Sequence, residues 1–209
     1  MFFINEVKGN STLDLKLDGT FSSLNLDLGL KIYEGNINKY KFKDLQSNIR
    51  YNNDKIYFDN LSFELADGNI FDINGIYNPL TKNYNFELNT ESLTIDLLNE
   101  LYSDYIELYK PDLENGFANN IKDIEGQINI NSTFTGRGLD LNNLIANGKL
   151  IVSTPFNKNR SYFNHLQTDF YLADGRILLS EGSASTNWGD ISFLGETGLT
   201  HNDNLDLQI

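Results

Sequence analysis

Hydrophobic and polar residues alternate along most of the chain. In the segment SSLNLDLGLKIYEG, every second position from Leu24 to Ile32 is leucine or isoleucine. Successive side chains of a β-strand point to opposite faces, so this segment predicts a strand with one apolar and one polar face. Similar segments recur with turn signals about every 8–12 residues, which is typical of antiparallel proteins. We expect an all-β fold, an elongated antiparallel β-sheet curled around its apolar face into a groove.

Two features interrupt the alternation. Its phase shifts by one residue at Asn60-Leu61, which predicts a turn or a β-bulge. The segment DLLNELYSDYIELYK has hydrophobic residues at helical spacing and predicts a helix at 96–109, with Asp96 as its N-cap and Pro111 after its end. Its polar face is acidic, which disfavours a helix lying on a membrane surface. We expect the helix to pack as a lid on one end of the sheet.

Two parts of the chain resemble each other. The 29 residues from Phe42 align without gaps with those from Phe163, an offset of 121 residues (163 − 42), and seven positions are identical. The identical pairs are Phe42/Phe163, Leu45/Leu166, Gln46/Gln167, Ile56/Ile177, Ser62/Ser183, Gly68/Gly189 and Ile70/Ile191. We interpret them as part of repeated units around 11–92 and 124–209, joined by a helical segment at 93–123.

The chain also ends within an alternating run, NLDLQI. We therefore expect residues 1–209 to be one fragment of a longer repetitive β-protein.

Composition argues against several functions. The net charge is −13, with 29 acidic and 16 basic residues, and no basic cluster could bind the phosphates of a nucleic acid. The chain has no cysteine for disulfides or thiolate metal sites. Neither His165 nor His201 has neighbours at metal-ligand spacing. We expect no enzymatic activity, no catalytic residue, no cofactor and no metal.

The apolar face has two physical explanations. Two sheets of a dry β-sandwich could cover each other, or a greasy ligand could fill a groove. Uniform Leu, Ile and Phe stripes suit a featureless hydrocarbon chain and favour the groove. The alternative is a dry β-sandwich or β-solenoid surface module, such as part of an adhesin. A polysaccharide-binding protein would instead need aromatic residues on the polar face, where Tyr33, Tyr51 and Tyr57 are the candidates.

Three segments carry a resemblance to a known family. GNIFDINGIYNPLTKNYNFELNTESLTIDLL, IEGQININSTFTGRGLDLNNLIANGKLIVS and LQTDFYLADGRILLSEGSAS are similar to recurrent segments of AsmA/TamB-like bacterial envelope proteins. The resemblance covers about residues 11–209 and rests on glycines and alternating leucines. It implies a taco-shaped sheet in a periplasm-spanning protein. Such a protein shields the acyl chains of phospholipid moving to the outer membrane, assists outer-membrane protein assembly, or does both.

The same resemblance implies partners, a location and a binding face. The partners would be phospholipid or other acyl-chain cargo and, through regions outside this fragment, an outer-membrane β-barrel. The location would be the periplasm, with an inner-membrane anchor outside the fragment. The implied lipid-facing residues are Leu13, Leu15, Leu17, Leu24, Leu26, Leu28, Leu30, Ile32, Ile56, Phe58, Phe86, Leu88, Ile128, Ile130, Leu150, Val152, Phe170 and Leu172.

Overall fold

The fold consists of long antiparallel strands and one α-helix in the part of the chain that the computed structural model describes. The described residues are 7–20, 23–37, 39–65, 68–109, 124–138, 141–157, 160–161, 165–198 and 206–208. The elements are β1 (Val7–Thr20), β2 (Ser23–Ile37), β3 (Tyr40–Asn52), β4 (Lys55–Leu65), β5 (Asn69–Tyr77), β6 (Asn83–Glu91), β7 (Leu93–Thr94), α1 (Ile95–Tyr109), β8 (Ile124–Arg137), the 3-10 helix η1 (Leu141–Asn143), β9 (Leu144–Asn157), β10 (Arg160–Ser161), β11 (His165–Ala173), β12 (Arg176–Thr186), β13 (Gly189–Gly198) and β14 (Asp206–Gln208). The predicted all-β class is confirmed.

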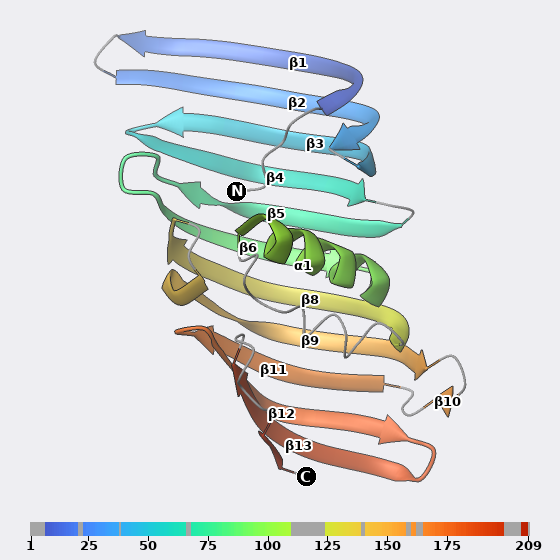
Figure 1. The fold of residues 1–209 in the computed structure, drawn as a ribbon. Coiled ribbons are helices and arrows are strands. Elements are labelled where there is room, and N and C mark those ends of the chain that lie inside the picture. The colour runs from blue at the N-terminus through green and yellow to red at the C-terminus, as the bar shows by residue number, and fades with distance from the viewer. Residues whose placement is uncertain are drawn as a thin grey trace. The chain divides into compact units, whose positions relative to one another are not determined.

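The strands follow one another through a single open sheet. Figure 1 shows the strands from β1 to β13 in this arrangement. The order is β1-β2-β3-β4-β5-β6-β8-β9-β11-β12-β13-β14, and β7 pairs with β8 and β10 with β9. A β-sandwich divides its strands between two facing sheets, and a parallel β-helix stacks parallel strands. The described strands do neither, because they form one antiparallel sheet. The sandwich and solenoid alternatives are therefore wrong as folds for these strands.

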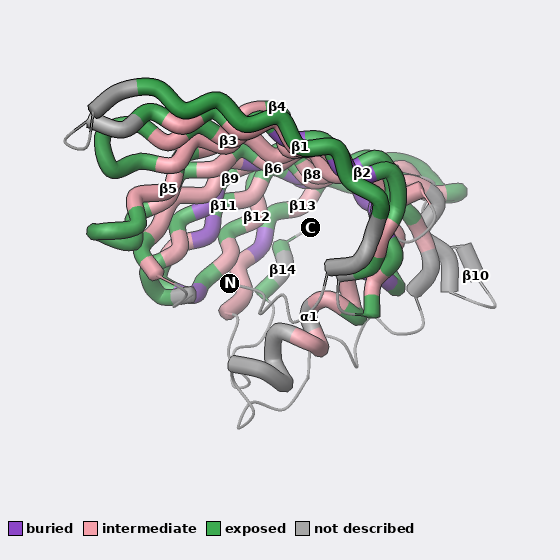
Figure 2. Tube along the Cα trace, turned by 90° about the horizontal axis from the view of Figure 1, so that it is seen from above, coloured by how far each residue is buried: buried purple, intermediate pink, exposed green. Residues whose placement is uncertain are grey.

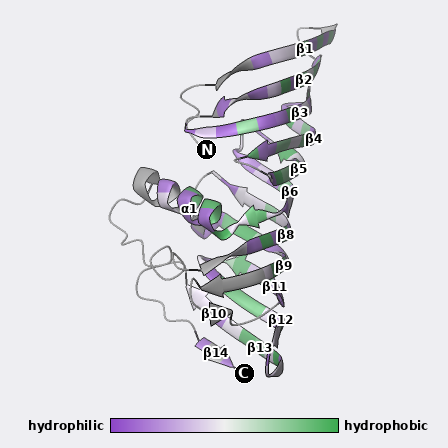
Figure 3. Cartoon of the chain, turned by 90° about the vertical axis from the view of Figure 1, so that its right-hand side faces the viewer, coloured by the Kyte–Doolittle hydropathy of each residue, from purple (hydrophilic) through white to green (hydrophobic). Residues whose placement is uncertain are grey.

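The chain divides into two compact units. Unit 1 comprises residues 1–90 and 132–144, and unit 2 comprises 91–131 and 145–209. Strand β8 contributes residues to both units, whereas the repeat in the sequence predicts a second unit that begins near residue 124. Figure 3 shows hydrophobic and hydrophilic segments interleaved along the strands of unit 1.

Strand register places one hydrophobic row across unit 1. Leu15 of β1 lies opposite Leu28 of β2, which lies opposite Ile49 of β3. Ile49 in turn lies opposite Phe58 of β4, and Phe58 lies opposite Gly75 of β5. Residues directly opposite each other across a sheet share a face. We call the face that carries this row the apolar face of unit 1.

A β-bulge keeps the hydrophobic residues of β4 on that face. Asn60 has a left-handed backbone with φ 55°, and the pairing of β4 with β5 shifts between Phe58 and Leu61. The extra residue lets Leu61 lie opposite Ile73 on the same face as Phe58. The bulge predicted at Asn60-Leu61 is confirmed.

The hairpins β3–β4 and β11–β12 share these irregularities, which supports the repeat seen in the sequence. Three left-handed residues of the first hairpin recur 121 positions later in the second. The pairs are Asn53 (φ 49°) and Asp174 (51°), Asp54 (58°) and Gly175 (70°), and Asn60 (55°) and Glu181 (50°). Two of the three register shifts recur as well: those at Gln46/Asn48 and Phe58/Leu61 correspond to those at Gln167/Asp169 and Leu179/Gly182.

The correspondence continues outside the hairpins with an offset of 120 residues. Leu28 lies opposite Ile49 in unit 1, and Gly148 lies opposite Phe170 in unit 2. On the other side, Leu65 lies opposite Asn69, and Thr186 lies opposite Gly189. The gapless alignment therefore holds for the hairpins, and the flanking strands are displaced by one residue.

Helix α1 begins one residue earlier than predicted. It spans Ile95–Tyr109, which confirms the helix expected at 96–109. The N–H of Leu97 donates to Oγ1 of Thr94 at 3.3 Å, so Thr94 is the N-cap. Asp96 lies in the first turn instead, and its prediction as the N-cap is wrong.

The start of α1 and the residues before it are buried in unit 2. Leu93, Ile95 and Leu97 are all buried. Leu93 of β7 lies opposite Ile128 of β8, so the residues directly before α1 are part of the sheet. The predicted proline stop at Pro111 lies outside the described residues.

Candidate functional site

The leucines of β1 are the most exposed part of the apolar face of unit 1. Leu13, Leu15 and Leu17 are 60%, 56% and 59% exposed. They lie opposite leucines of β2 on the same face. Figure 2 colours most of β1 as exposed. Leu24 lies in β2 opposite Gly19, and its side chain is outside the described residues.

Exposure decreases toward the middle of unit 1. The next hydrophobic positions are partly exposed, namely Leu26, Leu28 and Leu30 of β2, Ile56 and Phe58 of β4, and Phe86 and Leu88 of β6. Ile32, a predicted lipid-facing residue, is 8% exposed, and Leu45 and Phe42, which the prediction did not include, are 9% and 1% exposed. The predicted lipid-facing residues therefore include both buried and exposed positions.

Aromatic rings of β6 lie over glycines on neighbouring strands. A Cβ atom at Gly75 would overlap the ring of Phe86, and one at Gly136 would overlap that of Tyr84. The ring of Phe86 lies 5.8 Å from that of Phe58 and 5.9 Å from that of Tyr84. Burial raises the pKa of the Tyr84 phenol above its ordinary value. These rings pack together on the apolar face of unit 1.

Unit 2 has an apolar face of its own. Leu150 and Val152 of β9 lie opposite Thr168 and Leu166 of β11, and Phe170 lies opposite Gly148. Leu172 and Ile128 are buried, whereas Ile130, Leu150, Val152 and Phe170 are partly exposed. The ring of Phe193 fills the space that a Cβ atom at Gly182 would need.

Sequence reasoning missed the pairing of aromatic rings with glycines. The signal was a glycine inside a predicted strand, which often marks a close approach of another group. Each ring could be assigned to its glycine only after the register was known.

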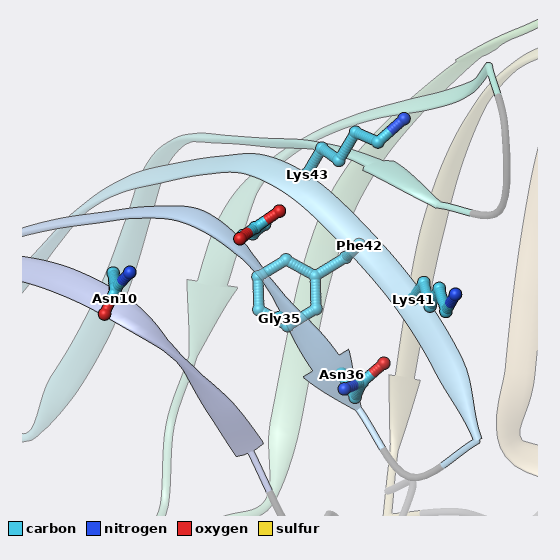
Figure 4. Close-up of a pocket in the computed structure, with 7 residues that line it drawn as sticks. Asn10, Gly35, Asn36, Lys41, Phe42 and Lys43 are labelled. Atoms are coloured by element: carbon cyan, nitrogen blue, oxygen red, sulfur yellow. The ribbon is translucent and has the colours of Figure 1, made fainter.

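A hollow of about 480 Å³ lies at the end of β2 and β3. Asn10, Glu34, Gly35, Asn36, Lys41, Phe42 and Lys43 line it. Figure 4 shows the Phe42 ring beside Gly35, the residue opposite it in β2. Charged and amide side chains therefore surround the edge of a buried ring, at one end of the apolar face.

The polar face of unit 1 carries an ion pair. Arg50 donates two hydrogen bonds to the carboxylate of Asp59, and its guanidinium lies 5.0 Å from the Tyr57 ring. This pairing lowers the pKa of Asp59 and raises the pKa of Arg50. The arrangement stabilises charges and offers no nucleophile or general base.

The three tyrosines proposed for a polysaccharide do not share the polar face. Tyr57 lies opposite Arg50, but Tyr51 lies opposite Leu26 and Ile56 on the apolar face. The prediction that placed Tyr51 on the polar face is wrong. Its hydroxyl donates to Asp54 at 3.1 Å, and this hydrogen bond raises the pKa of Tyr51.

The described residues offer little else to a reactive site. They contain no group of three or more His, Cys, Asp or Glu side chains placed to hold a metal ion. None of their helices combines the length and hydrophobicity needed to cross a membrane. His165 is exposed at the start of β11, and His201 lies outside the described residues.

Comparison with protein-family models, curated proteins and solved structures finds no match for this chain.

Proposed function

We propose that this chain shields the acyl chains of lipids on its apolar face. The observation that carries the proposal is the row of leucines on β1, each more than half exposed on the same face as the leucines of β2. Leu13, Leu15 and Leu17 each leave more than half of their surface open to solvent. An exposed row of branched hydrocarbon side chains is a surface that an acyl chain can cover without any polar contact.

The energetics favour hydrocarbon as the ligand. A phospholipid has about 30 methylenes, and exposing them to water costs roughly 25 kcal/mol at about 0.8 kcal/mol each. Binding to an apolar face offsets much of that cost. Each half-exposed leucine that the acyl chain covers stabilises the complex by about 1 kcal/mol more. Binding needs no chemical step, which agrees with the proposal that the chain is not an enzyme and needs no cofactor.

The proposed setting is the envelope of a bacterium with two membranes. An AsmA/TamB-like segment would carry phospholipid toward the outer membrane, assist outer-membrane protein assembly, or do both. The open antiparallel sheet with an apolar face supports this proposal. An inner-membrane anchor and an outer-membrane β-barrel partner would involve regions outside this chain.

Lipid uptake from fluorescent phospholipid vesicles tests the proposal. We expect the wild-type chain to take up lipid, and Leu15→Asp and Leu28→Asp to lose most of that uptake, because each places a charge on the apolar face. Gln46→Asp is the matched control. It adds the same charge on the polar face, opposite Lys31, and should leave uptake unchanged.

Circular dichroism of each variant separates loss of binding from loss of folding. No uptake by the wild-type chain would contradict the proposal and favour a surface or adhesin module. Equal uptake by folded Leu15→Asp and wild type would also contradict it.

A further inference from the structure

The outer edge of β1 is a long strand edge with no described partner. β1 has 14 residues and stands at one end of the strand order. Its backbone pairs with β2 on one side, and no described strand pairs with the other side. Such an edge presents unpaired N–H and C=O groups, which readily accept another strand. Its side chains are exposed on both faces from Asn10 to Asp18.

The sequence of β1 is complementary to itself in one antiparallel register. When Leu15 lies opposite Leu15 of a second copy, Leu13 lies opposite Leu17 on the apolar face. On the polar face, Asp14 then lies opposite Lys16, and the two-fold symmetry repeats this pair. Opposite charges that face each other across antiparallel strands are stabilising, and like charges are destabilising.

Neighbouring registers lack this match. With Asp14 on the two-fold axis, the two Asp14 carboxylates would face each other. With Lys16 on the axis, the two ammonium groups would face each other, and Asp14 would face Asp18. Shifts that place the axis between two residues would put leucines opposite charged residues. Centring on Leu17 would pair Lys16 with Asp18 but would place Leu15 opposite Gly19. The register centred on Leu15 matches the charges and also places every leucine from Leu13 to Leu17 opposite a leucine.

The pairing of β1 with β2 already follows the same pattern within the chain. Leu15 lies opposite Leu28, and Lys16 lies opposite Asp27. A second copy would place Lys16 between Asp27 of its own chain and Asp14 of the partner subunit. Charges would then alternate in sign along this row of the polar face.

We propose that two copies of this chain associate through the outer edges of β1, antiparallel and with Leu15 on the two-fold axis. The leucine rows of both copies then adjoin on one face. A two-fold interface closes on itself and yields a dimer, whereas head-to-tail pairing would continue into a filament. Among the described strands, β14 at the other end of the strand order spans three residues, Asp206–Gln208. Dimerisation by this edge does not depend on lipid binding.

Charge exchange tests the proposal by sedimentation over a concentration series. Asp14→Lys places lysine at both positions 14 and 16, and Lys16→Asp places aspartate at both. Like charges then face each other across the two-fold axis, so each variant should raise the dimer dissociation constant by about 10- to 30-fold. A mixture of the two variants should form a heterodimer, because opposite charges again face each other. The double variant Asp14→Lys/Lys16→Asp should recover the homodimer.

Asp18→Lys is the matched control. It makes the same charge change on the same face of β1, but position 18 would lie opposite Thr12 of the partner subunit. Its dissociation constant should stay within about twofold of the wild-type value. A wild-type chain that stays monomeric at all concentrations would overturn the proposal. Single variants that dimerise normally, or a mixture with no heterodimer, would also overturn it.

Because the chain has no cysteine of its own, a single introduced cysteine can report which residues face each other in the dimer. Leu15→Cys should form a disulfide-linked dimer under mild oxidation, because residues facing each other across an antiparallel pair lie about 5 Å apart. Asp18→Cys should not, because its two copies would lie about 20 Å apart. Filaments, or equal cross-linking of both variants, would reject this register.

Discussion

Leu15 and Phe42 differ sharply in exposure although both lie on the apolar face of unit 1, where Phe42 lies opposite Leu65 of β4. Leu15 is 56% exposed and Phe42 is 1% exposed. β1 has a described neighbour on one side, whereas β3 lies between β2 and β4. Between these two residues of the apolar face, position in the sheet decides which becomes core and which becomes surface. Core residues stabilise the fold, and surface residues remain available for a ligand or a partner.

The largest difference in stability should appear when Phe42 and Leu15 are each truncated to alanine. Phe42→Ala should lower the free energy of unfolding by about 3–5 kcal/mol, because it leaves a cavity in packed surroundings. Leu15→Ala should lower it by less than about 1 kcal/mol, because little of its surface is buried. Urea denaturation of both variants measures the two values. Equal losses of unfolding free energy in the two variants would contradict the division of the apolar face into core and surface.

Filling a glycine beneath an aromatic ring should have the next largest effect. Gly75→Ala should destabilise unit 1 by about 1–3 kcal/mol, because the new Cβ atom would overlap Phe86 and the backbone of Asn85. Gly29→Ala is the control on the polar face, where the nearest atom to a new Cβ lies 3.5 Å away. It should be neutral or stabilise by up to about 1 kcal/mol. Thermal unfolding distinguishes the two outcomes, and a tolerated Gly75→Ala would count against the ring placement.

The corresponding residues Ser47 and Thr168 give a smaller contrast between the two hairpins. Both are buried, but Oγ of Ser47 has no hydrogen-bond partner, whereas the Thr168 hydroxyl lies 3.0 Å from the carbonyl of Ser180. Thr168→Val should cost about 1 kcal/mol, and Ser47→Ala should be neutral or stabilise by up to about 1 kcal/mol. Chemical denaturation gives both values. A loss for Ser47→Ala as large as that for Thr168→Val would show that its hydroxyl has a partner.

The smallest effect should come from acid titration of the polar face. Arg50 lowers the pKa of Asp59 below its ordinary value of 3.8, so the ion pair stabilises the fold above that pH. This contribution should disappear as the pH falls through the lowered pKa of the folded state. The pair is exposed, so the change should stay under about 1 kcal/mol. The free energies of unfolding of wild type and Asp59→Asn, compared at neutral pH and at pH 3, measure this contribution. If the difference between the two proteins is the same at both pH values, the ion pair does not contribute to the pH dependence.

Alternation and local spacing were sufficient to predict much of the fold. The bulge at Asn60 follows from the phase shift between Phe58 and Leu61, and the helix follows from its own spacing. Thr94 was missed as the N-cap because Asp96 is also a favourable capping residue, and only the hydrogen bond distinguishes them. Tyr51 is two residues after Ile49, so strand periodicity alone could have placed it on the apolar face.

The candidate site was less predictable because it depends on register. The stripe residues could be identified from alternation, but Leu17 and Ile32 have the same local pattern and opposite exposure. The pairing of Phe86 with Gly75 joins two strands, and no local pattern specifies which ring covers which glycine.

Residue-level photolabelling tests the central claim most directly. A phospholipid with a photoreactive group in its acyl chain is bound to the wild-type protein, activated, and mapped by peptide mass spectrometry. We expect label on Leu13, Leu15 and Leu17 and little on Asp14, Lys16 and Asp18, because alternate residues of β1 lie on opposite faces. Equal labelling of both sets, or no labelling above that of a denatured control, would contradict acyl-chain binding on the apolar face.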